Sequence, residues 1–195
     1  MKRTLMTGMA VALTCVACGS ASAAGSAPTP TTRILDATGF SALFPSSWSM
    51  TTHTLKGATE YELSSSGALN ASGVPKPGAV GITITEVPYA VAVAGGATNP
   101  ATATPTQLVN GMVGTPPSAT GVKVTEALHS VTFADDAAYS ISLSYVTAGT
   151  PNLQEDIVVR HAEVLYLVEL DGEPTLQATG DAAIATLMKT WYWAA

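Results

Sequence analysis

The stretch Tyr139-Ser140-Ile141-Ser142-Leu143-Ser144-Tyr145 indicates the fold class most directly. Its large side chains alternate with serines, and a period of two is typical of a β-strand with one buried face and one small, polar face. Residues 80–87, 122–128 and 131–133 continue this alternation. The sequence therefore predicts a domain built mainly of strands.

Two more strands are expected near the C-terminus, at residues 154–161 and 164–170, with a turn at His161-Ala162-Glu163 between them. The run Val164-Leu165-Tyr166-Leu167-Val168 is apolar on both of its faces. A strand of this kind lies in the middle of a sheet and must be covered on both sides. Helices are the expected cover.

The clearest helical pattern lies close to the C-terminus, where apolar residues are spaced at i, i+3, i+4 and i+7. This stripe consists of Ile184, Leu187, Met188 and Trp191. Asp181 is expected at the start of the helix, where the helix dipole stabilises a carboxylate. A second helix is predicted to begin at Thr104-Pro105 and to end at Gly114. Its inward side chains would be Leu108, Val109 and Met112.

The segment Gly39-Phe40-Ser41-Ala42-Leu43-Phe44-Pro45-Ser46-Ser47-Trp48 resembles the opening of the PsbP-like superfamily, including its actinobacterial lipoproteins. The resemblance implies an α+β fold in which helices flank an antiparallel β-sheet as an α/β/α sandwich. It also implies a protein that binds other proteins or assists assembly rather than one that catalyses. The turn Ala134-Asp135-Asp136-Ala137 departs from the family, where a glycine is expected. Phe44, Pro45 and Trp48 are interpreted as a structural corner.

The N-terminus has the layout of a bacterial export signal. Lys2 and Arg3 precede an apolar run at residues 5–17, and the run stops at Cys18-Gly19-Ser20. Since a membrane-spanning helix needs about 20 apolar residues, this run is too short to span. We expect residues 1–17 to be a lipoprotein signal peptide and Cys18 to carry the lipid. The alternative is cleavage after Ala23, which would release a secreted protein.

The rest of the chain divides into a tether and one domain. Residues 18–32 are small and polar or Pro, a composition that does not order itself. Residues 33–195 suit a single domain with a sizeable core. Without Lys2 and Arg3 the chain has 6 basic and 14 acidic residues, a net charge of −8. Such a domain is repelled by phosphate backbones, so no nucleic-acid partner is expected.

Motifs of known chemistry are missing from the sequence. The three histidines, His53, His129 and His161, form no local metal-binding pair, so neither a metal site nor a cofactor is expected. The serines lack a G-x-S-x-G elbow, and no glycine-rich phosphate loop is present. Asp135-Asp136 is interpreted as a hairpin turn. We therefore expect a protein without catalytic activity.

Three aromatic residues crowd the C-terminus. Trp191 belongs to the predicted buried stripe, whereas Tyr192 and Trp193 should point elsewhere. They either cap the helix against the sheet or present an aromatic anchor to a partner. Tyr192 and Trp193 are therefore the candidate interface residues.

Together these features predict an extracytoplasmic lipoprotein, held at the cell membrane through Cys18, that serves as a non-catalytic binding or assembly module for an envelope protein. A second hypothesis is a carrier that holds a small apolar ligand between the sheet and a helix. An envelope hydrolase is the third.

Overall fold

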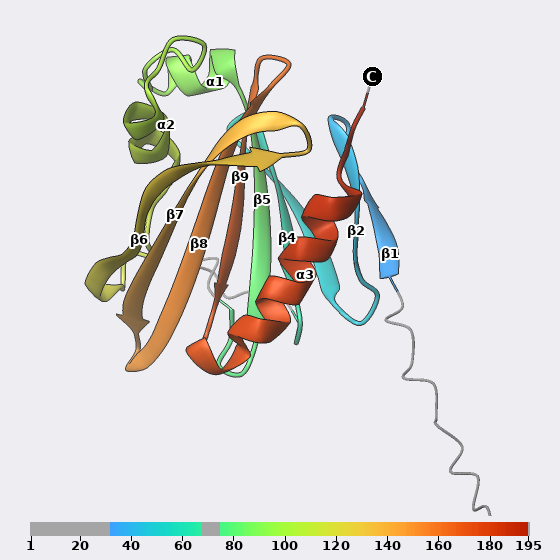
Figure 1. Ribbon diagram of the computed structural model, residues 1–195, viewed down its shortest axis with the longest axis vertical. Helices are drawn as coiled ribbons and strands as arrows, with labels where there is room; N and C mark the ends of the chain where they lie inside the picture. The colour runs from blue at the N-terminus through green and yellow to red at the C-terminus, as the bar shows by residue number, and fades with distance from the viewer. Residues whose placement is uncertain (1–31, 68–74, 195) are drawn as a thin grey trace, which may run out of the picture.

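A computed structural model describes residues 32–67 and 75–194 (Figure 1). The predicted signal peptide at residues 1–17, its Cys18 and nearly all of the tether lie outside the described residues. Within the described part of the chain, no helix is long and apolar enough to cross a membrane.

The larger of two sheets has seven strands in the order β3-β4-β5-β9-β8-β7-β6, and each neighbouring pair is antiparallel. The strands are β3 (Ser49–Leu55), β4 (Ala58–Ser64), β5 (Val80–Pro88), β6 (Thr120–Phe133), β7 (Asp136–Thr147), β8 (Thr150–His161) and β9 (Val164–Gly172). The predicted antiparallel sheet is confirmed. As its two apolar faces indicated, β9 is the central strand.

A smaller sheet packs beside the large one, with the order β1-β2-β10. Its strands are β1 (Thr32–Asp36), β2 (Phe40–Pro45) and β10 (Tyr192–Trp193). The predicted corner is confirmed, because β2 ends at Pro45 and Trp48 is buried directly after it. Strand β10 was not predicted from the sequence, since it is two residues long and forms through its pairing with Phe40 and Ser41.

Helices lie on both faces of the large sheet (Figure 1). On one face lies α3 (Gln177–Thr190), which follows the 3₁₀ turn η1 (Pro174–Leu176). On the other lie α1 (Tyr89–Ala94) and α2 (Pro105–Met112). Thr104 caps α2 through a capping box with Gln107, which explains why the helix begins where the sequence predicted.

Two expectations about individual elements were wrong. Helix α3 begins at Gln177 rather than Asp181, so Asp181 lies beyond the first turn and is exposed. Trp191 is buried but stands just after α3 in extended backbone, whereas Ile184 and Leu187 form the predicted inward stripe. The alternating residues 122–128 and 131–133 both lie in β6, whose register shifts three times along β7. Such irregularities bend a strand and increase its twist.

Strand β9 carries the core on both of its faces. Tyr166, Val168 and Leu170 belong to the core beneath α3, and Leu165 and Leu167 belong to the core beneath α2. Helix α3 approaches the sheet closely at Gly180: a Cβ atom there would lie 2.8 Å from Leu170 Cδ1 and 2.9 Å from Val80 Cγ2. Glycine suits position 180 because α3 packs so closely against the sheet that a larger side chain would collide with Leu170 and Val80.

Aromatic rings join the two sheets where α3 ends. The rings of Phe40 and Trp191 are stacked with centroids 3.8 Å apart, and Phe133 meets Trp191 edge-on at 4.8 Å. Aromatic pairs of this kind contribute about 0.5–1.5 kcal/mol beyond the burial of their area. The cluster therefore fixes the small sheet against the large one.

Replacing Trp191 by Ala should lower the free energy of unfolding by about 3–5 kcal/mol, because it empties a buried aromatic site. Tyr192→Ala is the matched control, since Tyr192 is the next residue and is 68% exposed, whereas Trp191 is 7% exposed. The control should change stability by less than about 0.5 kcal/mol. Denaturant unfolding followed by circular dichroism measures both. Similar losses in the two variants would contradict this account of the cluster.

Candidate functional site

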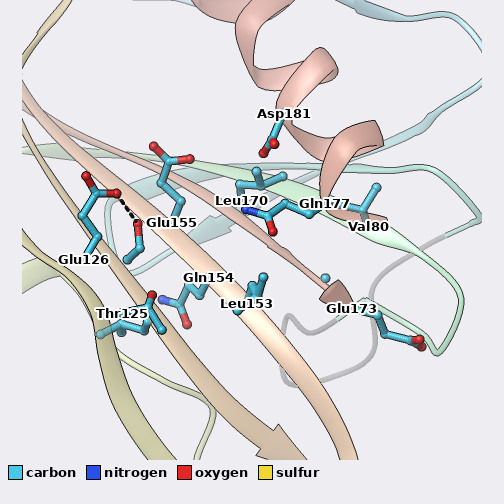
Figure 2. A pocket seen from close by; sticks show the side chains of 13 residues that line it. Val80, Thr125, Glu126, Leu153, Gln154, Glu155, Leu170, Glu173, Gln177 and Asp181 are labelled. Atoms are coloured by element: carbon cyan, nitrogen blue, oxygen red, sulfur yellow. Dashed lines mark hydrogen bonds between the residues drawn. The ribbon is translucent and has the colours of Figure 1, made fainter. Parts of the chain in front are cut away.

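An open groove of about 310 Å³ lies on the face of the sheet that carries α3 (Figure 2). Helix α3 packs over β5 and β9, and the groove runs from the start of α3 across β8 and β7 to β6. We call it the α3-side groove. Its apolar wall consists of Val80, Leu153 and Leu170, and its acidic lining residues are Glu126, Glu155, Glu173 and Asp181.

The serine face of β7 creates this groove. Ser142 pairs in register with Glu126 of β6 on one side and with Glu155 of β8 on the other, so the three side chains form a row across the strands. Because serine is small, the row is hollow in its middle. Ser142 Oγ donates to Glu126 Oε2 at 3.4 Å, and Ser140 Oγ donates to Glu155 Oε1 at 3.5 Å.

The groove is strongly acidic. Burial raises the pKa of the Glu155 carboxyl, and the negative charges of Asp181 and Glu126 raise it further, against smaller lowering contributions from the Ser140 hydrogen bond and His129. None of the described lining residues is Lys or Arg. The groove therefore offers hydrogen-bond acceptors and negative charge above an apolar wall.

A second acidic cluster occupies the opposite face of the same strands. Asp156 of β8 lies directly across from Glu169 of β9, and Gln154 lies across from Asp171. Tyr145 of β7 donates its hydroxyl hydrogen to Asp171 Oδ2. Burial is the largest cause of a raised pKa at all three carboxyls, and it raises that of Asp171 to about 6. The pKa of Asp156 is lowered by the Gln154 hydrogen bond and raised by the charges of Asp171 and Glu155. The pKa of Glu169 is raised further by the charges of Asp156, Asp171 and Glu60.

Hydrogen-bond acceptors outnumber donors in this cluster. Gln154 Nε2 donates to Asp156 Oδ2 at 2.8 Å and to the Gly114 carbonyl at 2.9 Å. Three buried oxygens, Gln154 Oε1, Asp156 Oδ1 and Asp171 Oδ1, have no hydrogen-bond partner in the described structure. Unpaired buried polar atoms are costly, about 1–3 kcal/mol each, so native structures contain few of them.

The two candidate interface residues occupy different surroundings. Trp193 is half-buried: its indole N–H donates to the Ala134 carbonyl at 3.1 Å, and its ring stacks on His161 with centroids 4.1 Å apart. Tyr192 points to solvent. Cys18, the predicted lipid-attachment residue, lies outside the described residues.

The three histidines lie on three different strands. His53 of β3 is 3.4 Å from Glu62, His129 of β6 is 3.7 Å from Glu126, and His161 of β8 is 2.8 Å from Asp136. Within residues 32–67 and 75–194, no three metal-ligating side chains are grouped so as to hold an ion.

Sequence reasoning missed both acidic sites. A signal was present, because Gln154 and Asp156 in β8, and Glu169 and Asp171 in β9, interrupt apolar strands at a spacing of two. That spacing places each pair on one face, but only the strand register shows that the two pairs meet.

No protein-family model matches the sequence, and no curated protein matches it either. Among solved structures, the chain is similar to cyanobacterial PsbP (CyanoP) from Synechocystis sp. PCC 6803, with 12% identity, a TM-score of 0.49, and coverage of 90% of this chain and 100% of that one. It is also similar to LpqN, involved in cell envelope biogenesis of Mycobacterium tuberculosis, with 11% identity, a TM-score of 0.46, and coverage of 85% and 91%. The first is a PsbP protein, the family that the opening motif resembles. The likenesses concern the fold.

The buried carboxyls should make stability fall as the pH rises. The unfolded chain loses these protons near about pH 4, whereas the native state keeps them to about pH 6 or above. Over this window the native state binds more protons, so the free energy of unfolding decreases with pH. Asp156→Asn should reduce the loss between about pH 4 and about pH 8 by on the order of 1–3 kcal/mol.

Denaturant unfolding at both pH values measures this difference. Asp36→Asn, at the exposed end of β1, serves as the control variant and should keep the pH dependence of the unchanged protein. An Asp156→Asn protein with the same pH dependence as its parent would show that the cluster is not protonated.

Proposed function

We propose that this chain is a non-catalytic binding domain of the cell envelope, held at a membrane by a lipid on Cys18, and that the α3-side groove receives a basic segment of an envelope protein. The acidic, open groove carries the proposal: the carboxylates of Glu126, Glu155 and Asp181 lie along a space that no described Lys or Arg enters, whereas that of Glu173 accepts the Gly78 N–H.

A lysine or arginine side chain suits this groove in two ways. Its charged end would meet Glu126 and Glu155 on the sheet or Asp181 on α3, and its aliphatic stem would lie on the apolar wall at Leu153 and Leu170. Long basic side chains commonly bury their stems while the charge stays near water. Complementary charge also speeds association and selects the partner.

The hydrogen bonds of the described residues support binding rather than catalysis. Ser140 and Ser142 donate to carboxylates, so no histidine activates them. The Nδ1 atom of His161 bonds to Asp136, and Trp193 covers one face of its ring. A nucleophilic site would need a hydroxyl or thiol hydrogen-bonded to such a histidine.

The carrier hypothesis corresponds to a smaller cavity on the other face. A space of about 250 Å³ lies between α1, α2 and the sheet, lined by apolar side chains that include Val91, Leu108 and Leu165. Ligand cavities usually have volumes of about 300–1,000 Å³, which is why the carrier is the second candidate.

Lipid attachment is tested by Cys18→Ser. The unchanged protein should fractionate with membranes and carry a covalent lipid mass on Cys18, because several acyl chains make attachment durable. The variant should lose that mass and leave the membrane fraction. Intact-protein mass spectrometry on protein from its own cells reads out both; an unlipidated chain beginning at Ala24 would contradict the anchor and indicate secretion.

The groove is tested by the double variant Glu126→Gln, Asp181→Asn. The probe is a lysine-rich peptide labelled with a fluorophore, and binding is followed by fluorescence anisotropy. The double variant should weaken binding by about five- to tenfold, since each exposed ion pair contributes up to about 1 kcal/mol. Binding should also weaken in about 0.5 M salt, which screens surface charges.

Glu163→Gln is the matched control, because Glu163 lies in the exposed turn between β8 and β9, away from the groove. If Glu163→Gln weakens peptide binding as much as the double variant does, attraction by the overall negative charge accounts for binding and the groove is not the site.

A further inference from the structure

The opposite face of the sheet contains a cavity of about 410 Å³ beneath the end of α2. We call it the α2-side cavity. One side is polar, with the carboxylates of Glu60 and Glu169 and the hydroxyls of Thr83 and Thr85. The other side is apolar and includes Met112 and Leu167. Its volume falls in the usual range for a small-molecule site, about 300–1,000 Å³.

Strand register brings the polar groups together. Thr83 of β5 pairs with Glu169 of β9, and Glu169 pairs on its other side with Asp156 of β8. One step along the strands, Glu60 of β4 pairs with Thr85 of β5. A carboxylate therefore lies at the edge of the cavity on β4, and another lies at its floor on β9.

Gln154 lies behind the wall of the cavity, where its amide nitrogen donates at 2.9 Å to the carbonyl of Gly114, a lining residue. Its side chain is 2% exposed, and its amide nitrogen lies 2.8 Å from Asp156 Oδ2 and 3.5 Å from Glu169 Oε2. Its amide oxygen has no partner within the described residues. The two amide hydrogens are shared among the Gly114 carbonyl, Asp156 and Glu169, so Glu169, which lines the cavity, keeps acceptor capacity for a hydrogen-bond donor from a ligand.

We propose that the α2-side cavity binds a small organic cation, with an ammonium or guanidinium group against Glu169 and Glu60 and an apolar body against Met112 and Leu167. The site lies on the opposite face of the sheet from the α3-side groove and extends the function proposed above. An organic cation suits the site better than a metal ion, because half of the wall is apolar and the described carboxylates form no metal-binding group.

The charged groups around Glu169 make binding dependent on pH. Burial is the largest cause of the raised pKa of Glu169, and the negative charges of Asp156 on β8, Asp171 on β9 and Glu60 on β4 raise it further. Tyr145 on β7 interacts with Glu169, and burial and Glu62 raise the pKa of Glu60 while His53 lowers it. β5 lines the cavity with Thr83, Thr85 and Val87, and the segment at residues 113–117 contributes no titratable side chain. Without a ligand, the raised pKa favours the protonated form of Glu169. A bound cation would release protons, so its affinity should increase as the pH rises.

The test uses the full chain in mild detergent, with phenethylamine as the probe and phenethyl alcohol as its neutral counterpart of the same shape. Calorimetry should detect saturable binding of the amine alone, with affinity rising on the order of tenfold between about pH 6 and about pH 8. Glu169→Gln keeps the shape of the side chain but removes its charge. It should lower the affinity for the amine at least about tenfold, since a largely desolvated charge pair is lost.

Glu60→Gln provides a second variant at the edge of the cavity. It should lower the affinity for the amine less than Glu169→Gln does, because Glu60 is nearer to solvent than Glu169. Glu163→Gln in the exposed turn between β8 and β9, outside both sites, is the control and should bind the amine as the unchanged protein does. The proposal is overturned if no saturable amine binding occurs, if the alcohol binds equally well, or if Glu169→Gln binds the amine unchanged.

The two proposals fail separately. Loss of peptide binding in the groove double variant with unchanged amine binding supports both sites. Amine binding that responds to Glu126→Gln instead of Glu169→Gln would move the amine to the groove and overturn the cavity.

Discussion

Strand β9 is apolar on both faces, and neither face can be left in water. Burying a side chain such as Leu165 or Val168 contributes about 1.5–3 kcal/mol, so a single layer of cover would forfeit half of the stabilisation of this strand. Helix α3 and the small sheet cover one face, and α1 and α2 cover the other. The layered architecture follows from this constraint, and the α3-side groove and the α2-side cavity each lie where a covering layer ends.

Cover on the α3 face depends on aromatic packing as much as on the helix. Trp191 leaves α3 in extended backbone and stacks on Phe40, and the next two residues form β10 against β2. The chain end is thereby fixed to the corner that Pro45 and Trp48 begin. The same packing uses Trp193 as a ring stacked on His161, so a C-terminus rich in aromatic residues is explained largely by the structure.

Local patterns were sufficient to predict β5 to β9, the central position of β9 and the start of α2, because alternation and the Thr104 cap are properties of neighbouring residues. They did not predict β3 and β4. Features that depend on contacts between distant segments could not be predicted. Strand β10 is a strand only because β2 lies beside it, and Asp156 meets Glu169 only through the register of β8 on β9. The serines of β7 were recognised as a polar face, but the groove they open depends on where α3 ends its cover.

Successive side chains of β8 point to opposite faces of the sheet and therefore belong to two different sites. Glu155 faces the α3-side groove, and the next residue, Asp156, faces the buried cluster on the other side. Apolar residues at Asp156, Glu169 and Asp171 would match the pattern of central strands and remove the cost of burying like charges. Positions that break an otherwise consistent pattern at a cost in stability are where function is expected. Of the three carboxyls, Glu169 reaches the α2-side cavity, and Gln154 joins it to Asp156 behind the cavity wall, so the buried cluster is continuous with the site that we propose for a cation.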